Sequence, residues 1–364
     1  MKIVVIGAGV AGLSIGWRLA KAGAETMVLE RAQPGQGATW ASAGMLAATA
    51  ESMLAPKGEE ALAHRSTQMW PDFAASIEDA SGIRIFYRKD GALIVARDTN
   101  EAEELRARAE MIDASFIGED EARRLVPLLA AGIEGALWVP EEAQVDNRAL
   151  GRALATAFLR AGGNLQTNEA AVRVQTAEAG TVAVLTPFRQ HLADAVVIAA
   201  GAWSGQIEGL PPAAALPVRP VKGEMIALDP PANAVLPRPL VWGNDVYLVP
   251  RGKRLLVGAT VSDSGFDTAR TGEARDWLHA QAAGLIPDLA DWRVSEHWAG
   301  LRPGSPDGLP IIGKTALENV YVASGQYRNG ILFAPAIGEA VQTLVLEGRV
   351  PPETAAFNPA RFQN

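Results

Sequence analysis

The sequence predicts an α/β fold in which a parallel sheet with flanking helices is combined with a second, mainly antiparallel sheet. Two observations lead to this prediction. Residues 2–7, KIVVIG, are a β-branched run followed by a glycine motif and a helical pattern, as expected for a strand buried on both faces of a parallel sheet. Between residues 216 and 298, strand-length segments alternate with Pro, Gly, Asn and Asp, which favours antiparallel strands joined by turns.

Composition limits the class of protein. The 364 residues exceed the usual size of one domain and 48% are hydrophobic, so two domains with a large core are expected. The net charge of −8 argues against a nucleic-acid partner. A membrane span and a cleavable signal peptide are not expected from the apolar runs, so the chain is predicted to be cytoplasmic. Without cysteine, and with four scattered histidines, no metal site is predicted.

The first thirty residues carry the parts of a dinucleotide-binding, Rossmann-like unit in order. Gly7, Gly9 and Gly12 form a G-x-G-x-x-G motif, and residues 25–30 are a second strand that ends in Glu30. The glycines permit a tight turn, close approach of a pyrophosphate, and close packing of helix on strand. Glu30 is placed to accept hydrogen bonds from ribose hydroxyls and disfavours a 2′-phosphate, so NADP is not expected. The motif alone leaves NAD and FAD open.

The segment after Glu30, residues 34–46, is rich in Gly, Ala, Ser and Thr. One interpretation is a flexible loop. The other is a segment that passes close under a large flat ring, with its amides facing the cofactor. NAD sites do not usually need such a stretch and flavoproteins often have one, so the segment favours FAD.

The remaining elements follow from periodicity and turn residues. Helices are expected at 59–82, 100–125 and 145–163, and a hairpin at 83–97 with its turn at 89–91. Short strands are expected at 171–176, 181–186 and 192–199, the last returning to the parallel sheet. These patterns predict a discontinuous nucleotide-binding domain of residues 1–81, 141–215 and 299–364, and a substrate-binding domain of residues 82–140 and 216–298.

Motifs along almost the whole chain resemble the D-amino-acid-oxidase-like FAD-dependent oxidoreductases, in particular their glycine oxidases of the thiamine-pathway type. Besides the glycine motif and Glu30, these motifs are ASAGML (41–46), DAVVIAAGAWSG (194–205), PVKGEM (220–225), VYLVPR (246–251), WAGLRPGSPDGLPIIG (298–313) and QYRNGILFAPA (326–336). The resemblance implies a p-hydroxybenzoate-hydroxylase-like architecture. It also implies FAD, which is expected to be non-covalent because the chain has no cysteine and no histidine near the glycine motif.

The resemblance further implies which residues contact the cofactor. They are Gly7, Gly9, Val10, Ala11, Gly12, Glu30, Arg31, Ala38, Thr39, Ala43, Gly44, Met45, Val172, Gly201, Gln326, Tyr327, Arg328, Asn329, Gly330, Ile331 and Leu332. Met45 is expected to form an apolar wall near the flavin, with a role as core filler as the alternative.

Three residues are candidates for the catalytic site. Flavin-dependent amine oxidation transfers a hydride from the substrate Cα to flavin N5, so the protein must orient the substrate carboxylate, usually with a bidentate arginine. Arg302, interpreted as part of a Pro/Gly turn, matches the family's carboxylate-binding arginine. Arg328 matches a second substrate-side arginine, and Tyr247 matches the substrate-facing tyrosine. The alternatives are a surface arginine for Arg302, an interdomain salt bridge for Arg328 and simple packing for Tyr247.

The implied activity is oxidation of a small anionic amino acid such as glycine, with O2 as acceptor and H2O2, an imine and then glyoxylate or another keto acid as products. Asp245 and Val261 replace a histidine and a methionine expected near the substrate, which leaves N-substituted glycines such as sarcosine and iminodiacetate open. The alternatives are a D-amino-acid dehydrogenase with a quinone or carrier acceptor, an NAD-dependent dehydrogenase and a non-catalytic flavin protein. A homo-oligomer is expected because the nearest family members form one.

Overall fold

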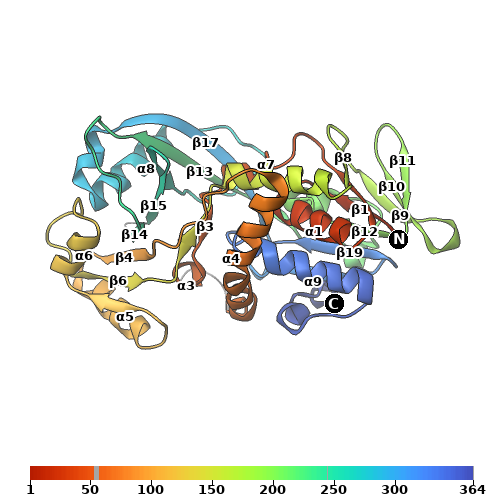
Figure 1. Ribbon diagram of the computed structural model, residues 1–364, viewed down its shortest axis with the longest axis horizontal. Coiled ribbons are helices and arrows are strands. Elements are labelled where there is room, and N and C mark those ends of the chain that lie inside the picture. The colour runs from red at the N-terminus through yellow and green to blue at the C-terminus, as the bar shows by residue number, and fades with distance from the viewer. Residues whose placement is uncertain (53–56, 244, 364) are drawn as a thin grey trace.

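The computed structural model describes residues 1–52, 57–243 and 245–363, and it confirms the predicted α/β class (Figure 1). A six-stranded sheet contains, in spatial order, β18 (Ile311–Lys314), β19 (Val320–Ser324), β12 (Ala195–Ile198), β1 (Lys2–Ile6), β2 (Glu25–Leu29) and β8 (Asn164–Gln166). An eight-stranded sheet contains β17 (Arg293–Gly304), β13 (Arg219–Asp229), β16 (Arg254–Gly258), β15 (Val246–Arg251), β14 (Leu240–Gly243), β4 (Ala92–Ala96), β6 (Gly135–Val139) and β5 (Ser115–Ile117).

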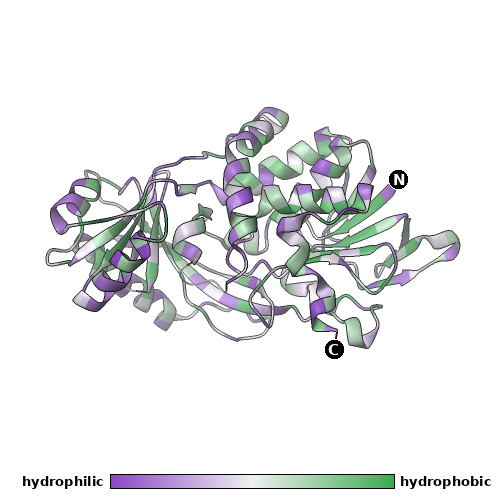
Figure 2. Cartoon of the chain, turned by 90° about the horizontal axis from the view of Figure 1, so that it is seen from below, coloured by the Kyte–Doolittle hydropathy of each residue, from purple (hydrophilic) through white to green (hydrophobic). Residues whose placement is uncertain are grey.

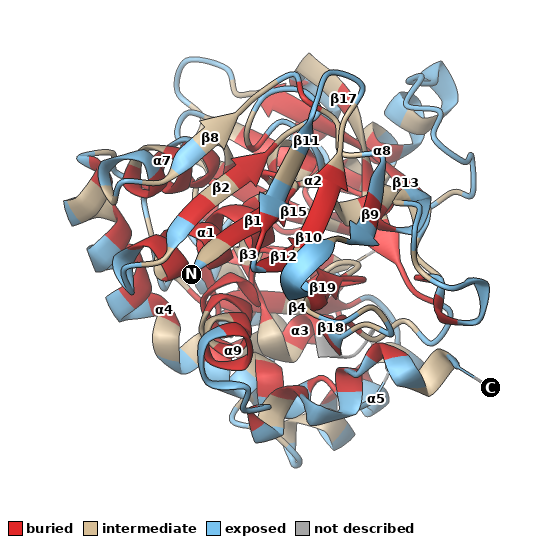
Figure 3. Cartoon of the chain, turned by 90° about the vertical axis from the view of Figure 1, so that its right-hand side faces the viewer, coloured by how far each residue is buried: buried red, intermediate tan, exposed pale blue. Residues whose placement is uncertain are grey.

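Strand β1 is buried on both faces, as its β-branched sequence predicts. It pairs in parallel with β2 on one side and with β12 on the other. Because alternate side chains of a strand point to opposite faces, Ile3 and Val5 enter one core while Val4 and Ile6 enter another. The second core lies against a small antiparallel sheet of β9 (Arg173–Thr176), β10 (Val182–Leu185) and β11 (Gln190–Ala193), whose outer strands are largely exposed (Figure 3).

Four helices cover the opposite face of the six-stranded sheet. Helix α1 (Val10–Lys21) packs between α7 (Asn147–Arg160) and α9 (Ala334–Glu347), and α4 (Glu60–Ser81) lies over the last two (Figure 1). A Cβ at Gly16 would lie 2.9 Å from Cγ2 of Val28, so this glycine lets α1 approach β2 closely. No helix in the described ranges has the length and apolar character needed to span a bilayer.

The eight-stranded sheet is antiparallel except between β14 and β4, which confirms the mainly antiparallel second sheet. Ile226 and Leu228 of β13 pack in a core with helix α8 (Gly272–Leu285), while Met225 and Ala227 point to the other face. Figure 2 shows both sheets as the most hydrophobic parts of the chain. The Met225 face, which α8 leaves uncovered, is the face that contributes to the site described below.

The single helix predicted for residues 100–125 is wrong. The structure has two helices there, α5 (Thr99–Ala109) and α6 (Glu119–Leu125), with strand β5 between them. Residues of β5 pair with β6, so pairing with a distant strand prevails over the local helical pattern.

Two strand predictions also differ from the structure. Within residues 83–97 only β4 is a strand, and it pairs with β6 and β14 rather than folding back as a hairpin. The strand predicted at 192–199 is divided, because β11 joins the small antiparallel sheet while β12 joins the parallel sheet, as predicted for this segment.

One border of the predicted domains falls inside a strand. Strand β17 pairs with β13 from Arg293 to Gly304, so the border predicted between residues 298 and 299 cuts through the eight-stranded sheet. The rest of the domain division stays a prediction.

Candidate active site

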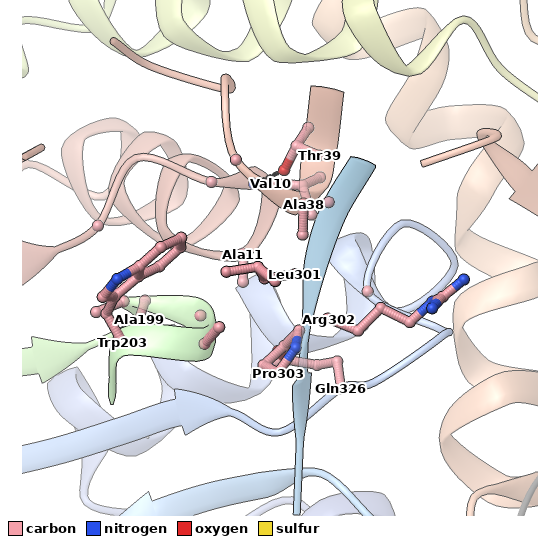
Figure 4. A pocket seen from close by; sticks show the side chains of 18 of the residues that line it. Val10, Ala11, Ala38, Thr39, Ala199, Trp203, Leu301, Arg302, Pro303 and Gln326 are labelled. Carbon is pink, nitrogen blue, oxygen red and sulfur yellow. Dashed lines mark hydrogen bonds between the residues drawn. The ribbon is translucent and has the colours of Figure 1, made fainter. Parts of the chain in front are cut away.

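A cavity of about 530 Å³ is lined by residues from both sheets (Figure 4). Its walls include the carboxyl ends of β1 and β2, the start of α1, residues of β13, β15 and β17, and the segment 326–331. Figure 4 shows Trp203 on one side of the cavity and the Arg302 side chain extending away from it. We call these two regions the Trp203 end and the Arg302 end.

The glycine motif brings the start of α1 to the cavity. Gly7 has a φ of 106°, a conformation that favours glycine, and a Cβ there would lie 2.5 Å from the carbonyl oxygen of Ala199. A Cβ at Gly12 would lie 1.9 Å from the Gly7 carbonyl oxygen. Gly12 therefore permits close packing without lining the cavity. Helix α1 follows Gly9, which supplies no capping side chain, so the positive end of its dipole faces the cavity.

Glu30 is fixed at the Trp203 end. Its Oε2 accepts a hydrogen bond from the Ala8 amide at 2.8 Å, and its Oε1 accepts one from the Ala32 amide at 2.9 Å. The guanidinium of Arg31 lies 3.8 Å from the centre of the Trp203 ring. An anchored carboxylate beside this stack is suitable for binding the hydroxyls of a ribose.

The small-residue segment is held in place, which excludes its interpretation as a flexible loop. It contains α2 (Ala38–Ala41) and β3 (Met45–Leu46), the latter paired with β7 (Ala143–Gln144). Asn147 donates hydrogen bonds to the carbonyl oxygens of residues 39 and 40, at 2.8 and 2.9 Å. Arg251 donates to Asn147 and to the carbonyl oxygen of residue 43, at 2.8 and 2.6 Å. Burial lowers the pKa of Arg251 to about 10.

All of the predicted site residues line this cavity except Gly12 and Leu332. Leu332 is buried behind the wall, where its carbonyl oxygen accepts a hydrogen bond from Nε1 of Trp70 at 2.8 Å. The structure thus brings the glycine motif, residues 30–45, Val172, Gly201 and residues 326–331 together. Their contacts with a bound cofactor stay predictions.

Arg302 lies on a strand, so its predicted position in a turn is wrong. It is in register with Val221 near the end of β17, at the edge of the eight-stranded sheet. The neighbouring Pro303 made the sequence resemble a turn, but an edge strand tolerates a proline because one side of its backbone needs no partner.

The Arg302 guanidinium is held by backbone groups. Its Nη1 donates to the carbonyl oxygen of Thr260 at 3.2 Å and lies 3.4 Å from that of Lys222. No carboxylate among the described residues forms an ion pair with it. A Cβ at Gly223 would lie 2.3 Å from this nitrogen, so the glycine makes room for the guanidinium. Arg302 is therefore positioned but still able to bind an anion.

Tyr247 on β15 occupies the same end of the cavity. A Cβ at Gly258 would lie 2.6 Å from the tyrosine ring and its hydroxyl, so a second glycine makes room for a second side chain of the cavity wall. The hydroxyl lies 3.8 Å from Sδ of Met225. Burial raises the pKa of Tyr247, an effect that the charge of Arg302 opposes. The phenol thus remains a hydrogen-bond donor.

The structure adds an acid that the sequence analysis missed. Glu51, on α3 (Ala48–Ser52), lines the cavity and is 6% exposed. Its Oε2 lies 3.9 Å from Nη1 of Arg328. Burial raises the pKa of the Glu51 carboxyl, and the charges of Arg328 and Arg302 oppose this. A lone acid in the alanine-rich stretch that follows Gly44 was the available signal.

Neither departure from the expected substrate residues lies in the cavity wall. Asp245 is exposed and Val261 is 52% exposed, and neither lines the cavity. The expectation that these two residues alter the cavity is therefore wrong.

The cavity fits a flavin dinucleotide. The start of α1 suits a pyrophosphate, although the Val10 amide itself donates to Oγ1 of Thr39 at 2.9 Å, and Glu30 suits a ribose. Gln326 lines the cavity and is 4% exposed, and its Nε2 has no hydrogen-bond partner among the described residues. A buried donor of this kind requires an acceptor, which the polar edge of a flavin provides. Within the described ranges, no cluster of His, Asp or Glu has the arrangement of a metal site.

The fold and the cavity are those of a flavin-dependent oxidoreductase. The FAD dependent oxidoreductase family matches residues 2–344, so the chain belongs to this family and uses FAD.

Its relatives include a glycine oxidase of Pseudomonas aeruginosa, 36% identical over 360 residues and 96% of each chain. The crystal structure of glycine oxidase from Geobacillus kaustophilus is similar with a TM-score of 0.92 and 31% identity, over 99% of this chain and 98% of that one. That of iminodiacetate oxidase from Chelativorans sp. BNC1 has a TM-score of 0.88 and 27% identity, over 98% of both. These findings confirm the predicted family and cofactor.

Proposed function

We propose that this oxidoreductase oxidises glycine-type amines, with O2 as the electron acceptor. The observation that carries the proposal is the Arg302 end of the cavity, where two arginines, a tyrosine and an acid meet. All four residues line the same cavity, and Oε2 of Glu51 lies 3.9 Å from Nη1 of Arg328. The similarity to glycine oxidases supports the same substrate class.

The substrate carboxylate is assigned to Arg302. A guanidinium can form two parallel hydrogen bonds with a carboxylate, which fixes direction as well as distance. The Tyr247 hydroxyl supplies a further donor to the same anion. With the carboxylate held, the substrate Cα is oriented by residues on the stiff strands β15 and β17.

FAD, when bound, would supply a two-electron acceptor for the hydride of the substrate Cα, with O2 as the final acceptor. The two electrons, the proton of the hydride and the N–H proton lost as the iminium becomes an imine together would give H2O2. The substrate becomes an imine, and water then releases glyoxylate and ammonia or an amine. The hydride leaves from the neutral form of the amine, so an ammonium group bound in the cavity first gives up a proton, to a carboxylate or to water, and the hydride transfer itself then needs no further protein base. The protein's part is to orient the substrate and to exclude water from the cavity.

N-carboxymethyl amines are a second candidate class. Arg328 provides a second guanidinium at the Arg302 end, which a second carboxylate could use. The similarity to an iminodiacetate oxidase supports this candidate.

Anaerobic reduction of the bound flavin tests both candidates. The holoenzyme is mixed with glycine, sarcosine, iminodiacetate, D-alanine or D-proline, and loss of the flavin absorbance is followed. We expect fast reduction by glycine or an N-substituted glycine. Reduction only by D-alanine or D-proline contradicts the proposed substrate class. Consumption of O2 with formation of H2O2 then tests the acceptor, and reduction of a quinone or dye without peroxide contradicts the oxidase.

A further inference from the structure

Glu51 has no role in the substrate binding described so far, although it lies beside the two arginines. We propose that Glu51 binds the amino group of the substrate, so that the Arg302 end recognises an amino acid through charges of both signs. This inference rests on the proposed function and names the group that selects an amine over other small acids.

The first support is an unsatisfied buried oxygen. Oε2 of Glu51 is buried and has no hydrogen-bond partner among the described residues. Its nearest cation, Nη1 of Arg328, lies 3.9 Å away, beyond hydrogen-bond length. A buried carboxylate oxygen requires a donor. Since Glu51 lines the cavity, an ammonium group bound there can supply it.

The second support is that Glu51 is held in position. The Glu51 amide donates to the carbonyl oxygen of Ala47 at 2.9 Å. The amides of Thr49 and Ala50, directly before Glu51, donate hydrogen bonds to Oε1 of Glu142, at 2.7 and 3.2 Å. These bonds anchor the first turn of the short helix, and Glu51 lies on that turn.

The third support is charge matching. The wall at this end carries two guanidinium groups and one carboxylate, and a zwitterionic amino acid carries one charge of each sign. Burial raises the pKa of the Glu51 carboxyl, which reflects the cost of a buried negative charge. An ammonium group within hydrogen-bond distance offsets that cost. A carboxylic acid without an amine offers no such compensation.

The test compares ligands with and without an amino group. Glycine and sarcosine are titrated anaerobically into the holoenzyme and their dissociation constants are taken from flavin reduction. Acetate is titrated in the same buffer and followed by the shift in the flavin spectrum. The proteins are the unmodified enzyme, Glu51→Gln, Glu51→Asp and the control Glu142→Gln. The control neutralises a buried acid that holds the same helix but does not line the cavity.

We expect Glu51→Gln to weaken the binding of glycine and sarcosine by at least about tenfold, the scale of one lost charge-assisted hydrogen bond. Acetate is expected to bind Glu51→Gln as tightly as the unmodified enzyme or more tightly, because a negative charge has been removed. Glu51→Asp keeps the charge and should recover part of the lost affinity. Glu142→Gln keeps an acceptor for the amides of the helix and should leave the ratio of glycine affinity to acetate affinity unchanged.

If Glu51→Gln weakens the binding of acetate and glycine equally, Glu51 acts on the substrate carboxylate or on the structure of the cavity. If it leaves glycine binding unchanged, Glu51 does not contact the amine. Either result overturns the inference. If Glu51→Gln fails to retain flavin, the same titrations are made with Glu51→Asp. A ratio of glycine affinity to acetate affinity equal to that of the unmodified enzyme then overturns the inference. If the unmodified enzyme is reduced by no amine, the proposed function fails first, a result distinct from a change confined to the variants.

Discussion

At the scale of single residues, one glycine sets the position of the guanidinium to which we assign the substrate carboxylate. A Cβ at Gly223 would lie 2.3 Å from the Arg302 guanidinium, closer than two heavy atoms can approach. We expect Gly223→Ala to displace the guanidinium and to lower kcat/KM for the amine at least about tenfold, with flavin content unchanged. Gly272→Ala is the matched control, since its Cβ meets nothing within 4 Å. Equal kinetics for both variants would contradict this account.

Arg302 itself carries a second prediction at this scale. Replacing it by alanine removes a charge-assisted pair, so we expect substrate binding to weaken by about 2 kcal/mol or more while FAD stays bound. Arg302→Lys should also be impaired, because an ammonium group cannot reproduce the two-pronged geometry of a guanidinium. Anaerobic titration of the flavin measures both. Full recovery by lysine would mean that charge alone suffices.

At the scale of elements, the segment of residues 38–45 depends on one asparagine. Asn147 makes three hydrogen bonds, two to this segment and one to Arg251, and it is buried. Asn147→Ala removes the donor to the carbonyl oxygen of Trp40 and one of two donors to that of Thr39, which keeps the Ser42 hydroxyl, at about 1–3 kcal/mol. We expect a lower ratio of flavin to protein after purification and weaker rebinding of FAD. The control Asn164→Ala, at an exposed position, should retain FAD normally.

Helix α3 gives a pH-dependent prediction. Burial raises the pKa of the Glu142 carboxyl from 4.5 to about 7. Below pH 4.5 the Glu142 carboxyl is protonated in both the folded and the unfolded state. Between about pH 4.5 and 7 it loses its proton only in the unfolded state. The unfolded state then binds fewer protons, so the free energy of unfolding falls as pH rises, by about 3 kcal/mol in total.

Glu142→Gln keeps an acceptor for the α3 amides and has no proton to lose. Its apoprotein should match the unmodified apoprotein near pH 4 and be about 3 kcal/mol more stable at pH 8. Unfolding by urea across this range measures the difference. Glu141→Gln, whose side chain is 56% exposed, is the control. If the free energy of unfolding changed with pH in parallel for Glu142→Gln and the unmodified chain, burial of Glu142 would not be the cause of the pH dependence.

The elements also show what the sequence could predict. The strand, glycine turn, helix and second strand at residues 2–30 are local patterns, and each agrees with the structure. The split of residues 100–125 was not predictable in this way, because β5 forms only by pairing with β6. The grouping of Arg302, Tyr247 and Arg328 was predicted from the resemblance to a known family and not from the spacing of these residues in the sequence. Glu51 stands out in the sequence only as a lone acid in an alanine-rich stretch, and this signal does not indicate which charged groups Glu51 meets after folding.

At the scale of the whole molecule, the cofactor cavity joins the two sheets. If FAD binds in this cavity, as we expect, its site exists only where both walls are assembled, and it should stabilise the entire chain by mass action, by about 2.7 kcal/mol at a hundredfold excess over its Kd. We expect removal of FAD to lower Tm, and added FAD to restore it in a concentration-dependent way. NADPH should give no such shift. A Tm independent of FAD would show that the cavity contributes nothing to global stability.

The residues expected to bind the cofactor and those expected to bind the substrate lie largely on different sheets. The glycine motif and Glu30 belong to the six-stranded sheet, whereas Arg302 and Tyr247 belong to the eight-stranded one. Substitutions on the cavity face of the second sheet can therefore change which amino acid is accepted without altering the glycine motif and Glu30. Divergence within the family can follow this route, and a mutant library for new amine substrates is best confined to the cavity-facing positions of β13, β15 and β17.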